Sequence, residues 1–311
     1  MKTTLTALSL VTALTAAAPA LAETPPVLKT WSTQPSFEDV RALATDGNGT
    51  IYTVESRNAR IQKLNAEGAV LLEWGTTGSG DGELDHPGGI AVGPNGNVYV
   101  VDTGNQRVQK YSNSGEYLLS WGSAGSGAGE FGTPCMVAVD GDGNVYVTDT
   151  GNDRVQKFSS NGTHLLSWGT YPDLQLPRGI AVDSNGDVLV VDEGNNRVQK
   201  YSSEGAMLST WGVMGTGEGQ LLLPGGLSLD GSDNVYVADT GNNRIQKFSP
   251  TGEYLSAWGT QGNSEDTFDA PADVVVGTGG IYVADTGNQR VQVFSYSPTP
   301  TVDVTWGNLK S

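Results

Sequence analysis

The sequence predicts an all-β fold, a six-bladed β-propeller whose blades are four-stranded antiparallel sheets. The first observation is a segment that recurs six times, with its arginine repeating every 43 to 47 residues. The second is that each copy consists of short apolar stretches separated by Gly, Asn and Ser. A period of about 40–50 residues with this composition is typical of propeller blades. The copies occupy residues 51–64, 98–111, 145–158, 188–201, 235–248 and 281–294.

The second repeat shows the elements expected in every blade. Asn and Gly separate its strands, because these residues tolerate the positive φ that tight turns require. A glycine-rich loop over 123–134 leads to the next repeat. A sheet of this kind has two apolar faces, and stacking in a closed ring covers both. Its strands are expected over 88–94, 97–102, 107–112 and 116–122.

The first 22 residues are expected to form a cleaved signal peptide. Lys2 provides a positive start, an apolar run follows, and Ala20-Leu21-Ala22 supplies the small residues of a cleavage site. Cleavage leaves a propeller over 23–296 that is extracytoplasmic, either secreted or periplasmic, and not inserted in the membrane. An uncleaved anchor is the alternative interpretation.

Tryptophan marks the outer strand of each blade, where it is expected to pack between blades or along the rim. Six blades need six outer strands, but the chain has seven tryptophans, each in a stretch of this kind. We expect residues 27–33 to close the last blade, because the prolines in 295–303 are typical of a linker. Residues 297–311 are then a C-terminal tail, with an extra outer strand at 301–308 as the alternative.

The formal net charge of −17 excludes some classes of partner. A chain this acidic repels phosphate backbones and anionic membrane surfaces, so we expect no nucleic-acid partner.

The single cysteine, Cys135, excludes an internal disulfide. Beside Met136 at the start of a strand, it is expected to be a small buried residue. We expect a monomer.

The repeat resembles the NHL repeat. The resemblance is carried by Pro-x-Gly-Ile-Ala-Val, followed by Gly-Asn-Val-Tyr-Val-x-Asp-Thr-Gly-Asn-x-Arg-Val-Gln-Lys-Phe, which five of the six copies match closely. It implies a six-bladed β-propeller. It leaves the function open, because NHL propellers include protein-binding platforms, RNA binders, sensor ectodomains and peptide-amidating lyases.

The histidines separate two enzymatic interpretations of this resemblance. The amidating lyases hold a zinc ion with histidines in the channel. This chain has only His86 and His164, which fall at unrelated places in their repeats, so the lyase interpretation is disfavoured. Enzymes of the gluconolactonase type, which hold calcium with carboxylates, remain open.

An Asp-x-Gly-Asn-x-Arg segment is the most regular charged motif. Carboxylate and guanidinium flank the same hairpin loop and can pair across it. Because a catalytic site needs one such arrangement and the chain has five, we interpret the motif as structural. Its members are Asp102 and Arg107, Asp149 and Arg154, Asp192 and Arg197, Asp239 and Arg244, and Asp285 and Arg290.

The candidate ligand-binding residues are those that depart from the repeat. Aligned at the start of the first strand, Pro271-Ala272-Asp273 and Pro177-Arg178-Gly179 replace Pro87-Gly88-Gly89, and blade one has Phe37-Glu38-Asp39. Blades six and one become neighbours when the ring closes, so Glu38, Asp39 and Asp273 are expected at one side of the channel mouth, with Arg178 opposite. Tyr171 is added by a shortened loop.

The sequence favours an exported binding protein that presents polar loops to a protein, peptide or glycan, with no catalytic residue, no resident metal and no cofactor. The alternative is a hydrolase or lyase that uses a divalent cation such as calcium at the channel mouth, with Asp39 and Asp273 as ligands and Arg178 as a substrate clamp. A structural component of the cell envelope is a third hypothesis.

Overall fold

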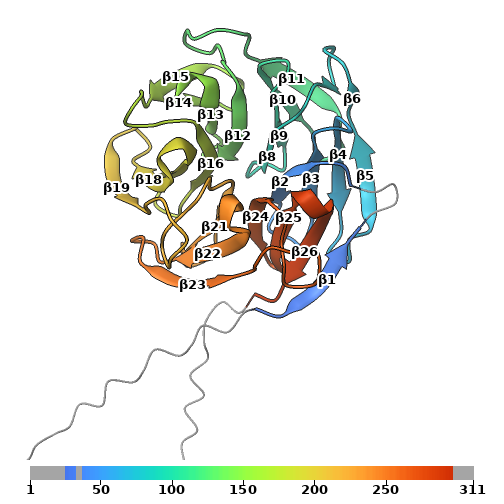
Figure 1. Cartoon of the computed structure of the whole chain (residues 1–311). Helices are drawn as coiled ribbons and strands as arrows, with labels where there is room; N and C mark the ends of the chain where they lie inside the picture. Colours follow the sequence, from blue (N-terminus) through green and yellow to red (C-terminus); the bar gives the residue numbers. More distant parts are fainter. Residues whose placement is uncertain (1–24, 33–36, 297–311) are drawn as a thin grey trace, which may run out of the picture.

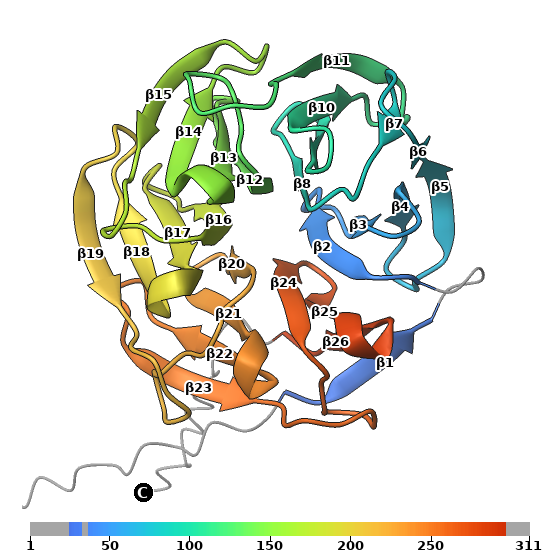
Figure 2. The ribbon, with the colours of Figure 1, turned by 45° about the horizontal axis from the view of Figure 1, so that its top comes forward.

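The computed structural model describes residues 25–32 and 37–296, and over these ranges the chain forms a six-bladed β-propeller. Figures 1 and 2 show the blades arranged around a central axis. The predicted fold class is confirmed. The expected signal peptide and the tail over 297–311 lie outside the described residues. Within the described ranges, no helix has the length and apolar character needed to cross a membrane.

Each blade is a four-stranded antiparallel sheet, as predicted. Blade 1 contains β2 Val40–Thr45, β3 Ile51–Glu55, β4 Arg60–Leu64 and β5 Val70–Trp74; blade 2 contains β8 Gly89–Val92, β9 Val98–Asp102, β10 Arg107–Tyr111 and β11 Tyr117–Trp121; blade 3 contains β12 Pro134–Val139, β13 Val145–Asp149, β14 Arg154–Phe158 and β15 His164–Trp168. Blade 4 contains β16 Pro177–Val182, β17 Val188–Asp192, β18 Arg197–Tyr201 and β19 Met207–Trp211; blade 5 contains β20 Leu227–Leu229, β21 Val235–Asp239, β22 Arg244–Phe248 and β23 Tyr254–Trp258; blade 6 contains β24 Pro271–Gly277, β25 Gly280–Asp285, β26 Arg290–Phe294 and β1 Val27–Trp31.

Short elements lie outside these sheets. Strands β6 Thr76–Thr77 and β7 Glu83–Leu84 form a parallel pair in the loop between blades 1 and 2. Single 3₁₀ turns follow the second strand of blades 3 to 6, at Thr150–Asn152, Glu193–Asn195, Thr240–Asn242 and Thr286–Asn288.

The N-terminal strand closes the ring. Strand β1 pairs antiparallel with β26, with Trp31 opposite Val291, and so supplies the outer strand of the last blade. Figure 2 shows β1 lying along the outside of β26. This is the closure expected from the likeness of residues 27–33 to the other outer strands.

The second strands show why the blades must stack. Every residue of β3, β9, β13, β17 and β21 is buried, so the side chains on both faces of each sheet are covered. Apolar side chains removed from water on both faces provide the main stabilisation of the ring. The sheets alone could not cover these faces.

The outer tryptophans join neighbouring blades. Trp121 of blade 2 contacts Tyr99 of its own blade, with ring centroids 6.2 Å apart, and Phe158 of blade 3, at 5.9 Å. Gly162, in a turn of blade 3, has a φ of 79° and lies against the same indole, where a Cβ would approach to 2.7 Å. The turn therefore requires glycine for both its backbone conformation and its packing.

The Asp-x-Gly-Asn-x-Arg motif fastens the loop between blades in each copy. The aspartate is fully buried, and the arginine Nε donates to its Oδ2 at 2.6–2.8 Å. Its Oδ1 accepts a backbone N–H from the incoming loop at 2.7–2.8 Å. In blade 1, Glu55 and Arg60 form the equivalent pair at 2.7 Å. The repeated charges are thus engaged inside the fold.

Replacing Asp149 with alanine is expected to reduce the free energy of unfolding by about 3 kcal/mol, because the Arg154 guanidinium and several N–H groups lose their buried acceptor. Urea denaturation at neutral pH measures the change. Asp142→Ala is the matched control, since that aspartate is exposed in a turn of the same blade and should cost less than about 0.5 kcal/mol. Equal stability of the two variants would contradict a structural role for the motif.

Replacing Trp31 with alanine is expected to destabilise the ring by about 3–5 kcal/mol, because Trp31 is buried in the closing strand and packs on Tyr282 at 5.3 Å. Lys29→Ala on the same strand removes an exposed side chain and should leave the melting temperature almost unchanged. Thermal denaturation followed by tryptophan fluorescence and circular dichroism compares them. A Trp31 variant as stable as the Lys29 variant would show that β1 contributes little to closure.

Candidate functional site

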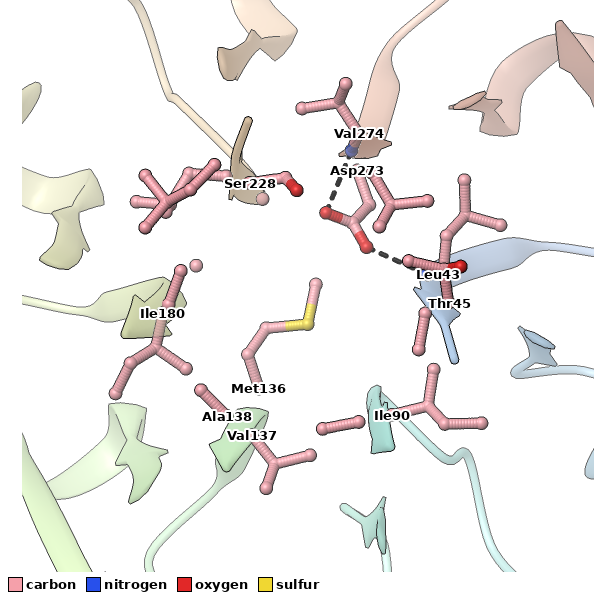
Figure 3. Close-up of a pocket in the computed structure, with 18 of the residues that line it drawn as sticks. Leu43, Thr45, Ile90, Met136, Val137, Ala138, Ile180, Ser228, Asp273 and Val274 are labelled. Carbon is pink, nitrogen blue, oxygen red and sulfur yellow. Dashed lines mark hydrogen bonds between the residues drawn. The ribbon is translucent and has the colours of Figure 1, made fainter. Parts of the chain in front are cut away.

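The first strands of all six blades surround a central cavity of about 310 Å³. Its wall is mainly aliphatic, and Figure 3 shows Leu43, Ile90, Val137 and Ile180 arranged around it. Of the described residues that line it, only Asp273 has an ionisable side chain. We call this space the channel cavity.

Asp273 is buried between the first and last blades, with 6% of its surface exposed. Its Oδ2 accepts the N–H of Leu43 on β2 at 2.8 Å, and its Oδ1 accepts the N–H of Val274 at 2.9 Å (Figure 3). Burial raises the pKa of the carboxyl group from 3.8 to about 7, although the two N–H groups and the charge of Arg178 act in the opposite direction. Asp273 therefore links blade 6 to blade 1.

A second cavity of about 380 Å³ opens on the face that carries the turns between the second and third strands. We call it the mouth pocket. Met136 lines both spaces, so the mouth pocket adjoins the channel cavity. Blades 1 to 4 all contribute to its lining, which consists of Asp39, Arg41, Ser56, Arg57, His86, Gly88, Thr103, Cys135, Met136 and Arg178.

The structure brings together three of the five candidate ligand-binding residues predicted from the sequence. Asp39 and Arg178 line the mouth pocket, and Asp273 lines the adjoining channel cavity. Glu38 has an exposed side chain, and its backbone N–H donates to Glu55. Tyr171 is 67% exposed in its loop. Glu38 and Tyr171 line neither of these two spaces.

The register of blade 1 differs from the alignment expected from the sequence. Val40 pairs with Glu55 just as Pro271 pairs with Asp285, so Arg41, three residues beyond Glu38, occupies the position of Arg178. Phe37 instead corresponds to buried residues of the preceding loop, such as Leu84. The alignment failed because blade 1 has valine where the other blades have the proline that marks the strand start.

Two arginines of the mouth pocket, Arg41 and Arg57, were not predicted. Arg57 lies in the turn between β3 and β4, at the place where the second repeat has Gly104. The sequence did hold a signal for both. Once the six arginines that recur every 43 to 47 residues are set aside, only Arg41, Arg57 and Arg178 remain.

The three arginines of the mouth pocket differ in how many hydrogen bonds and ion pairs they form. Arg41 Nε donates to Asp39 Oδ1 at 2.9 Å. Arg178 Nη1 lies 3.6 Å from Glu193 Oε1, and its buried Nε has no hydrogen-bond partner among the described residues. Arg57 is exposed and forms no ion pair within the described ranges. Donor capacity is therefore available in this pocket.

The cysteine and the histidine of the mouth pocket each interact with neighbouring groups. Cys135 is partly exposed, and burial of its thiol raises the pKa, with the nearby Arg178 and Arg41 charges opposing this shift. His86 Nδ1 lies 2.5 Å from Asp85 Oδ1 at the exposed rim. The other histidine, His164, is on β15 and contacts Ser167. Within the described residues, no three His, Cys, Asp or Glu side chains are grouped to hold a metal ion.

The free energy of unfolding of the wild type is expected to fall relative to that of the Asp273→Asn variant as the pH rises. The raised pKa means that the protonated carboxyl stabilises the fold below about pH 4, and that this contribution is lost as the pH rises through about 7. Between pH 5 and pH 8 the wild type should lose about 2–3 kcal/mol relative to the variant. Urea denaturation of both proteins at each pH tests this, with Asp142→Asn as control. A difference independent of pH would show that Asp273 is ionised throughout.

Comparisons with known proteins match the repeat architecture. The NHL repeat family matches residues 84–111, 133–158, 174–201, 221–248 and 268–294. No curated protein matches the chain.

Solved structures show the same fold at low sequence identity. An inactive variant of virginiamycin B lyase from Staphylococcus aureus with quinupristin is 15% identical, with a TM-score of 0.60, and the match covers 83% of this chain and 80% of that one. A streptogramin B lyase is 13% identical with a TM-score of 0.63, covering 85% and 95%. A protein of unknown function from Bacteroides thetaiotaomicron is 19% identical with a TM-score of 0.66, covering 87% and 73%.

At these identities the solved structures establish the fold alone. The family matches add the identity of the repeat, and the sheet topology accounts for the frayed first copy as blade 1 of the same ring. The chain belongs to the NHL-repeat proteins.

Proposed function

We propose that this protein is an exported, non-enzymatic binding propeller that presents its mouth face to a protein, peptide or glycan. The observation that carries the proposal is the separation of the charged residues into two groups. The repeated Asp–Arg pairs are engaged inside the blades, whereas Arg41, Arg57 and Arg178, which do not belong to these pairs, line the mouth pocket. Repeat folds present binding surfaces in this way: the scaffold residues are the same in every copy, and the residues of one face differ between copies.

Cys135 and Thr103, two of the residues that line the mouth pocket, support binding more than covalent catalysis. The raised pKa of Cys135 disfavours the thiolate, which is the reactive form. The hydroxyl of Thr103 donates to the carbonyl of Pro134 at 2.9 Å. Neither group is set up as an activated nucleophile, which needs an adjacent base or a lowered pKa.

A cation-dependent hydrolase or lyase is the second candidate. Two similar structures are named as lyases, and the His86–Asp85 pair lies at the rim of the mouth pocket, which favours this candidate. The three guanidinium groups oppose it, because they raise the electrostatic cost of placing a divalent cation beside Asp39. The balance of charge favours a ligand with an acidic group.

Binding should depend on the mouth face and not on the opposite face. The full chain is applied to peptide and glycan arrays to find ligands that it binds. Binding to these array hits is then measured for the Tyr171→Ala and Arg178→Ala variants. We expect each substitution to weaken the hits about tenfold or more if its side chain contacts the ligand. Asp142→Ala, in a turn of the opposite face, is the matched control and should bind like the wild type.

Two results would contradict this proposal. Hits that weaken equally in the Asp142 variant would place binding away from the mouth. A metal-dependent turnover of a bound ligand, with a thermal shift on adding calcium, would support the second candidate instead.

A further inference from the structure

We infer that the mouth pocket binds a compact oxyanion, a carboxylate or phosphate group carried by the ligand. This inference rests on the proposed binding function and specifies the chemistry that the site recognises. It depends on three observations: where the arginines lie, what they replace, and how many of their donors are already satisfied.

The distribution of arginine in the chain is uneven. Six of its nine arginines are those that recur every 43 to 47 residues, and each pairs with the acidic residue of its own blade. The other three, Arg41, Arg57 and Arg178, come from blades 1 and 4 and all line the mouth pocket. In a chain with a net charge of −17, this gathers positive charge at one place.

These arginines replace residues with little or no side chain. The strand register places Arg41 and Arg178 at the position occupied by Gly88, Cys135, Gly225 and Ala272 in the other blades. Arg57 takes the place of a glycine that the other five repeats have in this turn. The ring closes without guanidinium groups at these positions in its other blades, so folding does not require them there.

Part of the donor capacity of the three arginines is unused inside the protein. Arg57 has no ion pair within the described ranges, and Arg178 Nε is buried without an acceptor. A buried donor without a partner costs free energy. The exposed guanidinium group of Arg57 can donate directly to a ligand. The fork of N–H groups on guanidinium matches the paired oxygens of a carboxylate or phosphate.

Acidic groups engage two of these three arginines and leave Arg57 without an ion pair within the described ranges. Asp39 is the only acid among the described residues of the pocket lining, and it is occupied by Arg41. Glu193 Oε1 lies 3.6 Å from Arg178 Nη1, and Asp85 pairs with His86. Asp273, in the adjoining channel cavity, is held by two backbone N–H groups. The charge of Arg57 is thus the one in the lining that no carboxylate of the described residues balances.

The size of the pocket and the charge around it restrict the ligand to a compact group. A volume of about 380 Å³ accommodates one anionic group and a short attached chain. An extended polyanion would have to cross the acidic surface of the rest of the molecule, which repels it. Met136 and Cys135 offer apolar contact to the carbon atoms that carry the anionic group.

Calorimetric titration of the full chain at low ionic strength tests this inference. The probes are inorganic phosphate, succinate, and a short peptide with either a free or an amidated C-terminus. We expect saturable binding of at least one free oxyanion that weakens as sodium chloride is added. Arg57→Gln should weaken it about tenfold or more, because a charge-assisted hydrogen bond is lost.

Arg57 is the informative position because it is exposed and folding does not use its charge. Lys29→Gln, on the outer strand β1, is the matched control, since it removes one exposed positive charge far from the mouth pocket. It should bind the probes like the wild type, and both variants should melt like the wild type. Preference for phosphate, for succinate or for the free peptide terminus identifies the source of the oxyanion.

Two results would overturn the inference. One is the absence of saturable binding for all the probes, and the other is binding that Arg57→Gln and Lys29→Gln weaken equally. If array hits nevertheless persist and still depend on Tyr171 or Arg178, the proposed binding function stands and only the oxyanion is wrong. If array hits and titrations both fail, the binding function fails as well.

Discussion

The structure depends on the need to cover two apolar faces of every blade. In the second strand of each blade all side chains are buried, so no blade has a face that water can solvate. A closed ring satisfies this need for all six blades at once. The buried Asp–Arg pairs then fix the loops that connect the blades, because each aspartate accepts both a guanidinium N–H and a backbone N–H of the incoming loop. Packing and loop geometry are thereby tied together in every copy of the repeat.

This constraint determines where function can arise. Residues that cover the blade faces or fasten the loops are committed to the fold, which leaves the starts of the first strands and the turns of the mouth face free to vary. The substitutions of blades 1 and 4 occur there: Arg41 and Arg178 begin first strands, and Arg57 lies in a turn. The position of the candidate site is therefore a consequence of the repeat architecture, and its charge is a property of three residues.

The fold could be predicted from the sequence because the repeats are nearly identical and the seventh tryptophan indicated how the ring closes. The site could be predicted only in part. Arg178 departs from a well-defined alignment, so it was recognised, whereas Arg41 was missed because blade 1 lacks the proline that marks the strand start. The environment of Asp273 depends on contact with Leu43, which lies 230 positions away in the sequence. Only ring closure creates that contact, and with it the burial that raises the pKa of the carboxyl.

The pairing of β1 with β26 also orders the events of biosynthesis. Val27 leaves the ribosome long before Phe294, yet these two are partners in one sheet. Blades 1 to 5 contain only strands that are contiguous in sequence and can assemble as the chain emerges, whereas the sixth must wait for its final hairpin. Strand β1 therefore has no sheet partner until β26 has been synthesised. Closure of the ring therefore follows synthesis of the last blade, and its rate depends on bringing together segments that are far apart in the sequence.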